Sequence, residues 1–221
     1  MPDVTIYRDP CVHIVVRNFL GDALKEKILA GLKPLLTHAG KVYQQDPDGI
    51  DRSHDEDGRK GVWAYPFFKE NPTLDDSCLS LFEAQIWTPK LRAAFRETGD
   101  MLFQSYDFTN SSEILLSCYE VGGEMNWHFD QWSLCAVSYI FSMDNTPKEG
   151  GTPKEGGAFV LGEIGIENDA MRTKEYPFED DFLIIFPCKA THKVAPTKQK
   201  RYSLQYWAEC RFDRPQKSPY A

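Results

Sequence analysis

Short apolar runs dominate the second half of the chain. From Glu113 onward, β-branched and aromatic residues gather in six runs separated by glycine, proline and charged turns: EILLSCYE, LCAVSYIFSM, GAFVLGE, DFLIIFP, HKVAPT and RYSLQYWAECRF. Runs of this length with such punctuation are typical of β-strands. Many short strands in succession predict an antiparallel barrel or jelly roll. Residues 113–210 are therefore predicted to form a β-barrel core.

The first half of the chain follows a different pattern. CVHIVVRNFL has the β-branched residues of a strand, and the segment from Gly21 to Leu36 then repeats apolar residues at helical spacing. A second helix is predicted from Thr88, which suits an N-cap, with Pro89 at the first helical position. We expect residues 1–112 to supply a strand, supporting helices and a possible lid loop. The whole chain, 1–221, is expected to be one domain.

Two segments between these elements are rich in turn residues. Residues 44–61, QQDPDGIDRSHDEDGRKG, are dense in aspartate and glycine and are predicted to form a loop. Residues 146–157 repeat the hexapeptide TPKEGG in tandem. Two copies are too few for a solenoid, so a duplicated hairpin turn is favoured over a binding motif.

Composition narrows the class of protein. No run approaches the roughly 18 apolar residues of a membrane span, and the N-terminus lacks the basic and apolar regions of a signal peptide, so we expect a cytoplasmic protein. The six cysteines form no C-x-x-C pair and are expected to be buried and reduced. A net charge of −8, without a stripe of Lys or Arg, argues against a duplex nucleic-acid partner.

Candidate metal chemistry centres on the segment NWHFDQW. His128 and Asp130 are two residues apart, so they project the same way from a strand. A third ligand has to come from a distant strand, and His192 follows the apolar run FLIIFP by a few residues. Two histidines and one carboxylate hold a redox-active iron while leaving coordination positions open. The HFD pair alone is weak support for a metal site, and the distant His192 strengthens it.

A candidate anion site adjoins these ligands in the sequence. Arg201 lies nine residues after His192 and shares a strand face with Ser203. The planar guanidinium fork beside a hydroxyl group suits a carboxylate held by two hydrogen bonds.

The joint pattern resembles the Fe(II)/2-oxoglutarate-dependent oxygenases, and it is closest to their prolyl-hydroxylase-like branch. The resemblance consists of His128-x-Asp130, His192 after a gap of 64 residues, and Arg201 with Ser203. It implies a mainly β fold, a double-stranded β-helix or jelly roll with N-terminal supporting helices. It further implies that the three ligands bind Fe(II) and that Arg201 and Ser203 hold the distal carboxylate of 2-oxoglutarate, with O2 as the other cosubstrate.

Two tyrosines are candidates for further cosubstrate contacts. Tyr119, nine residues before His128, matches a tyrosine that often contacts the cosubstrate in this branch. Tyr139, on the next strand, is a second candidate, although a shift of one residue in register would turn it to the other face.

The resemblance implies a dioxygenase that hydroxylates an unactivated C–H bond and releases succinate and CO2. An aspartate at position 130, where related halogenases carry a small residue, favours hydroxylation over halogenation. Desaturation or cyclisation stays open. A chain of this length without a peptide-docking module favours a small-molecule substrate such as a free amino acid, and a peptidyl or protein prolyl substrate is the alternative.

Substrate contacts are expected from aromatic residues near glycines. The acidic loop 46–57 and the segment GVWAYPFF, with Trp63 and Tyr65, form a candidate lid. Trp132, two residues after Asp130, is a third candidate.

Two rival classes of protein share some of these features. A cupin-type metal isomerase or lyase uses a β-barrel and histidines but needs no clamp from Arg201 and Ser203. A metal-free jelly-roll binding module tolerates His128 and His192 as polar rim residues. The pattern leaves the oligomeric state open.

Overall fold

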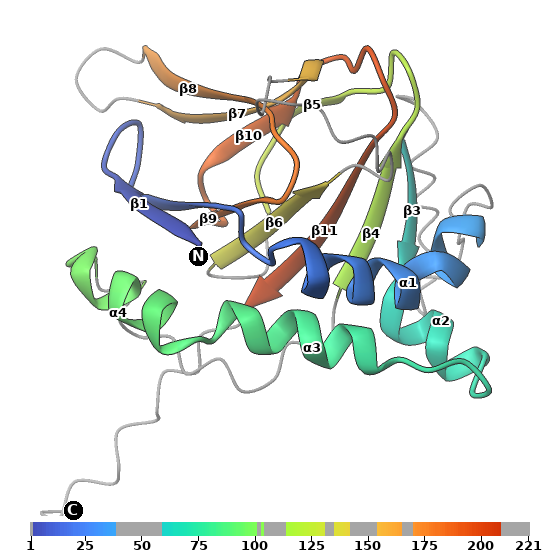
Figure 1. Cartoon of the computed structure of the whole chain (residues 1–221). Helices are drawn as coiled ribbons and strands as arrows, with labels where there is room; N and C mark the ends of the chain where they lie inside the picture. The colour runs from blue at the N-terminus through green and yellow to red at the C-terminus, as the bar shows by residue number, and fades with distance from the viewer. Residues whose placement is uncertain are drawn as a thin grey trace, which may run out of the picture.

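Two antiparallel sheets face one another in the computed structural model, which describes residues 2–38, 59–100, 103, 114–130, 135–141, 154–164 and 170–208 (Figure 1). The larger sheet has the strand order β1 (Asp3–Tyr7), β2 (His13–Arg17), β9 (Phe182–Pro187), β6 (Cys135–Phe141), β11 (Arg201–Ala208), β4 (Ile114–Tyr119) and β3 (Arg59–Trp63). The smaller sheet has the order β5 (Met125–His128), β10 (Thr191–Val194), β7 (Lys154–Ile164) and β8 (Met171–Phe178). This arrangement confirms the predicted jelly roll.

Each of the six apolar runs contains a strand, and the strands that the pattern missed are short or exposed. β5 has only four residues, none of them fully buried. β8 lies at the edge of the smaller sheet, and most of its residues face solvent, with only Tyr176 and Phe178 buried. An edge strand of this kind shows little of the apolar alternation that identifies strands in a sequence.

Helices cover the face of the larger sheet that points away from the smaller one (Figure 1). They are α1 (Asp22–His38), α2 (Ala64–Glu70), α3 (Ser77–Ile86) and α4 (Pro89–Glu97). The predicted cap of α4 is confirmed, because the Thr88 hydroxyl accepts a hydrogen bond from the Leu91 amide at 3.5 Å and Pro89 is the first helical residue. None of the helices in the described ranges is long and apolar enough to span a membrane.

The larger sheet separates two apolar cores, and its strands alternate between them. Leu204 and Tyr206 of β11 belong to the core under the helices, which we call the helix-side core. Side chains such as Tyr119, Ile140 and Phe182 belong to the core between the two sheets, the inter-sheet core. Because neighbouring residues of a strand point to opposite faces, Arg201 and Ser203 point with the inter-sheet core.

Asp181, in the turn between β8 and β9, joins the start of α1 to the larger sheet. Its two carboxylate oxygens each accept a hydrogen bond of 2.9 Å, one from the Leu20 amide and one from the Gly21 amide. The hydroxyl of Tyr139 on β6 donates a third hydrogen bond of 3.0 Å to the same carboxylate. A carboxylate placed there satisfies amide groups that a helix start leaves without intrahelical partners.

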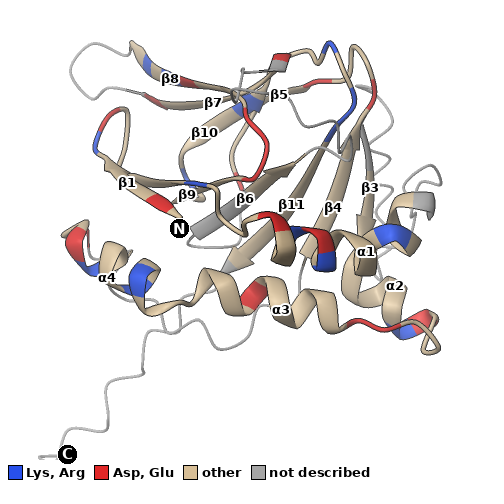
Figure 2. Ribbon diagram, in the orientation of Figure 1, with Lys and Arg blue, Asp and Glu red and all other residues tan. Residues whose placement is uncertain are grey.

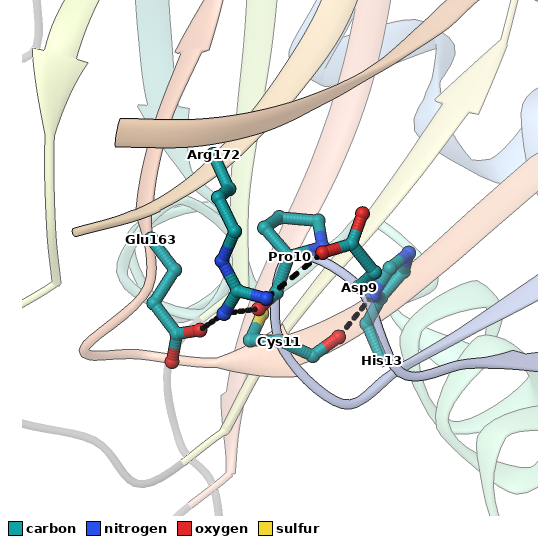
Figure 3. Close-up of polar contacts among 6 residues, drawn as sticks. All are labelled: Asp9, Pro10, Cys11, His13, Glu163 and Arg172. Carbon is teal, nitrogen blue, oxygen red and sulfur yellow. Dashed lines mark hydrogen bonds and ion pairs between the residues drawn. The ribbon is translucent and has the colours of Figure 1, made fainter. Parts of the chain in front are cut away.

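The loop between β1 and β2 closes against the smaller sheet through Arg172 on β8 (Figure 3). The Arg172 guanidinium donates to the Asp9 carboxylate at 3.1 Å, to the Pro10 carbonyl at 2.9 Å and to the Glu163 carboxylate at 2.7 Å. Lys and Arg are otherwise interspersed with Asp and Glu over the elements drawn in Figure 2. The expected absence of a duplex nucleic-acid partner stays a prediction.

His13 lies fully buried behind this loop and has a fixed hydrogen-bonding pattern. Its Nδ1 contacts the Cys11 carbonyl at 2.8 Å, as Figure 3 shows. A carbonyl only accepts, so Nδ1 carries the proton and Nε2 accepts from the hydroxyl of Tyr176. Burial lowers the pKa of His13 from 6.5 to about 4, although the hydrogen bond to the Cys11 carbonyl opposes the shift. The folded protein therefore holds His13 neutral.

We predict that His13 makes the protein acid-sensitive. As pH falls from 6.5 towards 4, His13 becomes protonated in the unfolded chain but stays neutral in the folded protein. The free energy of unfolding therefore decreases. The shift in pKa corresponds to a decrease of about 3 kcal/mol in the free energy of unfolding over that pH range. Urea unfolding at several pH values measures the slope, with His13→Gln as the control because an amide replaces the ring without titrating. Equal pH slopes for the two proteins would contradict the prediction.

Candidate metal centre and anion clamp

The three predicted metal ligands converge at the start of β10. β5 and β10 pair antiparallel with His128 directly opposite His192, and the two imidazole centroids are 4.1 Å apart. Asp130 follows the end of β5, and its Oδ2 lies 3.9 Å from His192 Nε2. Candidate ligand atoms of the three residues all lie within 4.8 Å of one another. One ion can therefore contact all three side chains.

Both histidines present the nitrogen that suits a metal. His128 Nδ1 lies 2.9 Å from the Asn126 carbonyl, and His192 Nδ1 lies 3.1 Å from the Ala190 carbonyl. Since a carbonyl only accepts, each Nδ1 carries the proton, and the lone pair is on Nε2. Hydrogen bonds of this kind fix the tautomer and the ring orientation of metal-binding histidines.

Packing and a backbone contact hold the ligands in place. The His192 ring contacts Phe159 and Phe186 with centroid distances of 5.6 and 4.8 Å. Asp130 does not lie within β5 as the two-residue spacing implied, because the strand ends at His128. The Asp130 amide instead donates to the Cys188 carbonyl at 3.0 Å, which ties the carboxylate-bearing residue to the turn before His192.

Arg201 carries a buried charge on the inter-sheet side. Its side chain is fully buried, and its guanidinium carbon lies 5.0 Å from the centroid of Tyr119 and 5.8 Å from that of Phe178. No described residue accepts a hydrogen bond from any of its three guanidinium nitrogens. Burial lowers the pKa of Arg201, and Tyr119 opposes that shift. Arginine stays protonated in proteins, so this site calls for an anion.

Ser203 is oriented by two further polar residues that the sequence pattern had not singled out. The Ser117 hydroxyl donates to Gln205 Oε1 at 2.8 Å, and Gln205 Nε2 donates to the Ser203 hydroxyl oxygen at 3.2 Å. Because Ser203 accepts from Gln205, its own O–H is left to donate. A carboxylate accepts hydrogen bonds and donates none, so this chain of donors suits a carboxylate beside Arg201.

The two tyrosines lie on opposite faces of the larger sheet. Tyr119 pairs with Arg201 across β4 and β11, is fully buried in the inter-sheet core and donates to Met125 Sδ at 3.7 Å. Tyr139 pairs with Leu204, belongs to the helix-side core and donates to Asp181. Burial and the Asp181 carboxylate raise the pKa of Tyr139. The predicted cosubstrate contact of Tyr139 is therefore wrong, and its role is structural.

The predicted substrate residues do not lie together on one face of the sheet. Trp63, at the end of β3, faces Trp207 of β11 at a centroid distance of 5.6 Å, and Trp207 packs against the inter-sheet core. Tyr65 instead packs against the helix-side core and donates to Glu83 at 2.7 Å, on the opposite side of the sheet from Arg201, and its substrate contact stays a prediction. Trp132 and the loop 46–57 lie outside the described residues. Trp207 was missed, although it shares the strand face of Arg201 and Ser203.

Comparisons with known proteins agree with this geometry. Residues 114–209 match the 2OG-Fe(II) oxygenase superfamily, and this range contains all three metal ligands together with Arg201 and Ser203. No curated protein sequence matches the chain significantly. The superfamily and the triad together imply Fe(II) and 2-oxoglutarate, which the buried guanidinium and the donor chain at Ser203 also fit.

Solved structures show the same fold at low sequence identity. A prolyl hydroxylase from Trichoplax adhaerens, solved with a hypoxia inducible factor peptide, is 15% identical with a TM-score of 0.60, over 90% of this chain and 83% of that one. A prolyl-4-hydroxylase from Pseudomonas putida is 16% identical with a TM-score of 0.55, over 90% of this chain and 92% of that one. Residues 114–209 are thus identified as a 2OG-Fe(II) oxygenase domain.

Proposed function

We propose that the protein is an Fe(II)- and 2-oxoglutarate-dependent hydroxylase of an unactivated C–H bond. Two observations together carry the proposal: a three-residue ligand cluster packs against the inter-sheet core, and so does a fully buried guanidinium that no described residue neutralises. A metal-binding β-barrel without an anionic cosubstrate has no use for that buried charge. A cupin-type enzyme and a metal-free binding module explain the buried charge of Arg201 less well.

Each residue has a distinct part in binding. His128, Asp130 and His192 would hold Fe(II) through two Nε2 atoms and one carboxylate, leaving coordination positions open. Arg201 and Ser203 would hold the distal carboxylate of 2-oxoglutarate. When bound, iron, keto acid and O2 supply the oxidising power, with succinate and CO2 released. Aromatic side chains around His192 exclude water from that side of the centre.

Asp130 supports hydroxylation over halogenation. Its carboxylate lies with the two histidines in one cluster, so it fills the position that a halide would need. Desaturation and cyclisation use the same centre, and identification of the product by mass distinguishes them, since hydroxylation adds one oxygen atom to the substrate.

The aromatic pair Trp63 and Trp207 is the best-supported candidate for substrate contact. Both rings are partly exposed and lie on the same sheet face as Arg201 and Ser203. Flat aromatic surfaces suit the aliphatic part of a small molecule. We propose a free amino acid or a derivative of one as the substrate.

A prolyl residue in a peptide is the second candidate. The fold resembles two prolyl hydroxylases over most of each chain, and an aliphatic ring packs well on an indole face. Release of succinate with free L-proline, with a panel of other free amino acids and with a short proline-containing peptide separates the two candidates. Turnover of the peptide alone would replace the small-molecule assignment.

Replacing Arg201 by methionine is predicted to abolish 2-oxoglutarate binding while making the apoprotein more stable. Methionine keeps an apolar stem of similar length and removes a buried charge. In related cases, replacing buried ionic groups by apolar residues raised the free energy of unfolding by about 1–4 kcal/mol. An anaerobic titration with Fe(II) and 2-oxoglutarate follows the visible charge-transfer band of a keto acid chelated to iron. The band should appear in the wild type and be lost in Arg201→Met, with Fe(II) binding retained.

Two controls complete that titration. His128→Ala should lose Fe(II) itself, since one of the three ligands is gone. Iron binding without the band in the wild type would favour the cupin-type reading. No iron binding at all would favour the metal-free module. A decrease in apoprotein stability for Arg201→Met would contradict the view that the guanidinium is an uncompensated charge.

Substrate contact by the tryptophan pair predicts a selective kinetic change. Trp63→Ala and Trp207→Ala should each raise the KM of whichever substrate the succinate assay identifies by about tenfold, the loss of one good aromatic contact. The Kd of 2-oxoglutarate should stay unchanged. Tyr65→Phe is the matched control, because Tyr65 packs on the opposite side of the sheet. An unchanged KM in both tryptophan variants would remove the pair from the substrate site.

A further inference from the structure

The second TPKEGG copy ends in two glycines that cross the loop between β10 and β11. Gly156 and Gly157 have positive φ angles of +69° and +67°. Gly156 forms an isolated bridge with Thr197, and the Gly157 amide donates to the Pro196 carbonyl at 2.9 Å. The segment is therefore part of the wall around Arg201, which begins β11. The first copy lies outside the described residues.

Gly156 leaves no room for a side chain, and Gly157 leaves little. A Cβ added at Gly156 would lie 2.7 Å from both the Lys198 amide nitrogen and the Pro196 carbonyl oxygen, so any substitution there displaces backbone. A Cβ at Gly157 would lie 3.1 Å from Thr197 Cγ2 and 3.2 Å from Arg201 Cδ. The backbone at Gly157 thus packs directly on the stem of the Arg201 side chain.

Arg201 cannot move aside easily. Its side chain is fully buried, with the rings of Tyr119 and Phe178 beside the guanidinium. Interiors packed at this density resist shifts of even a few tenths of an ångström. A contact at Cδ therefore displaces the guanidinium group, whose Nε is bonded directly to Cδ.

Thr197 also lies against Gly157, and three hydrogen bonds hold it in place. Its hydroxyl donates to the Glu120 carbonyl at 2.6 Å, its amide donates to the Gly123 carbonyl at 3.0 Å, and its carbonyl accepts from the Gly122 amide at 2.8 Å. These bonds attach the loop after β10 to the turn between β4 and β5. Thr197 is almost completely buried.

We propose that Gly157 and Thr197 are positioning residues that set the place of the Arg201 guanidinium and hence the affinity for 2-oxoglutarate. The inference rests on the proposed function, in which a carboxylate of 2-oxoglutarate is the partner of Arg201. Hydrogen bonds from a planar guanidinium fork to a carboxylate depend on both distance and angle. A displaced stem spoils that geometry without touching the iron ligands. The second hexapeptide copy thereby has a role in the site.

The test compares two alanine substitutions with the same backbone strain. Gly157→Ala introduces the contact with Arg201 Cδ. Gly99→Ala is the control, because Gly99 has a φ of +70° and nothing lies within 4 Å of an added Cβ there. In the anaerobic titration of the Fe(II)-loaded protein, Gly157→Ala should raise the Kd of 2-oxoglutarate at least tenfold, with the Kd of Fe(II) unchanged. Gly99→Ala should change neither constant.

A second variant tests the steric cause. Thr197→Ser removes Cγ2, the atom nearest to the added Cβ, and keeps the hydroxyl that donates to Glu120. The double variant Gly157→Ala/Thr197→Ser should regain part of the lost 2-oxoglutarate affinity, because removal of Cγ2 leaves space for the added Cβ.

The outcomes distinguish the two proposals. Equal 2-oxoglutarate affinities for Gly157→Ala and Gly99→Ala, with the wild type binding and Arg201→Met not binding, would overturn the positioning role alone. Absence of 2-oxoglutarate binding in the wild type, or equal binding by Arg201→Met, would overturn the proposed function and this inference with it.

Discussion

The buried positive charge of Arg201 is the constraint on which the arrangement of the site depends. Desolvating a guanidinium without a hydrogen-bonded anion is unfavourable, and here the aromatic faces of Tyr119 and Phe178 offset only part of that penalty. The fold tolerates the charge because the inter-sheet and helix-side cores supply the stability. In the proposed function, a carboxylate of the cosubstrate would accept hydrogen bonds from this guanidinium, so the desolvation penalty left by folding would be offset when the cosubstrate binds.

The metal ligands are arranged mainly by backbone groups. Carbonyls of Asn126 and Ala190 set the tautomers of the two histidines, and the Cys188 carbonyl holds the amide of Asp130. These contacts exist before any metal arrives, and they need no ordering when it binds. Pre-arranged donors of this kind lower the entropic cost of assembling a metal centre. The turn before His192 supplies two of the three carbonyls, which links the carboxylate ligand and the second histidine.

Alternate residues of a strand point to opposite faces of the larger sheet, so functional and structural side chains alternate along β11. Arg201, Ser203, Gln205 and Trp207 point with the inter-sheet core, whereas Leu204 and Tyr206 pack under the helices. Tyr139 follows the second group, and with Asp181 it anchors α1 to the sheet. A one-residue change in the register of β6 would exchange these roles. Correct pairing across the sheet is thus as important for the site as the identity of its residues.

The sequence by itself determined the β-rich second half, the ligands His128, Asp130 and His192, and the pairing of Arg201 with Ser203. Each of these depends on local spacing or on residue chemistry, which the order of amino acids states directly. Only the tertiary structure decided that Tyr139 and Tyr65 face the helices, that Trp63 meets Trp207, and that Gly157 packs on Arg201. The physical reason is that the larger sheet is buried on both of its faces. Strands such as β6 are apolar at successive positions, so hydrophobicity does not reveal which side chains point inward, and long-range pairing sets that direction.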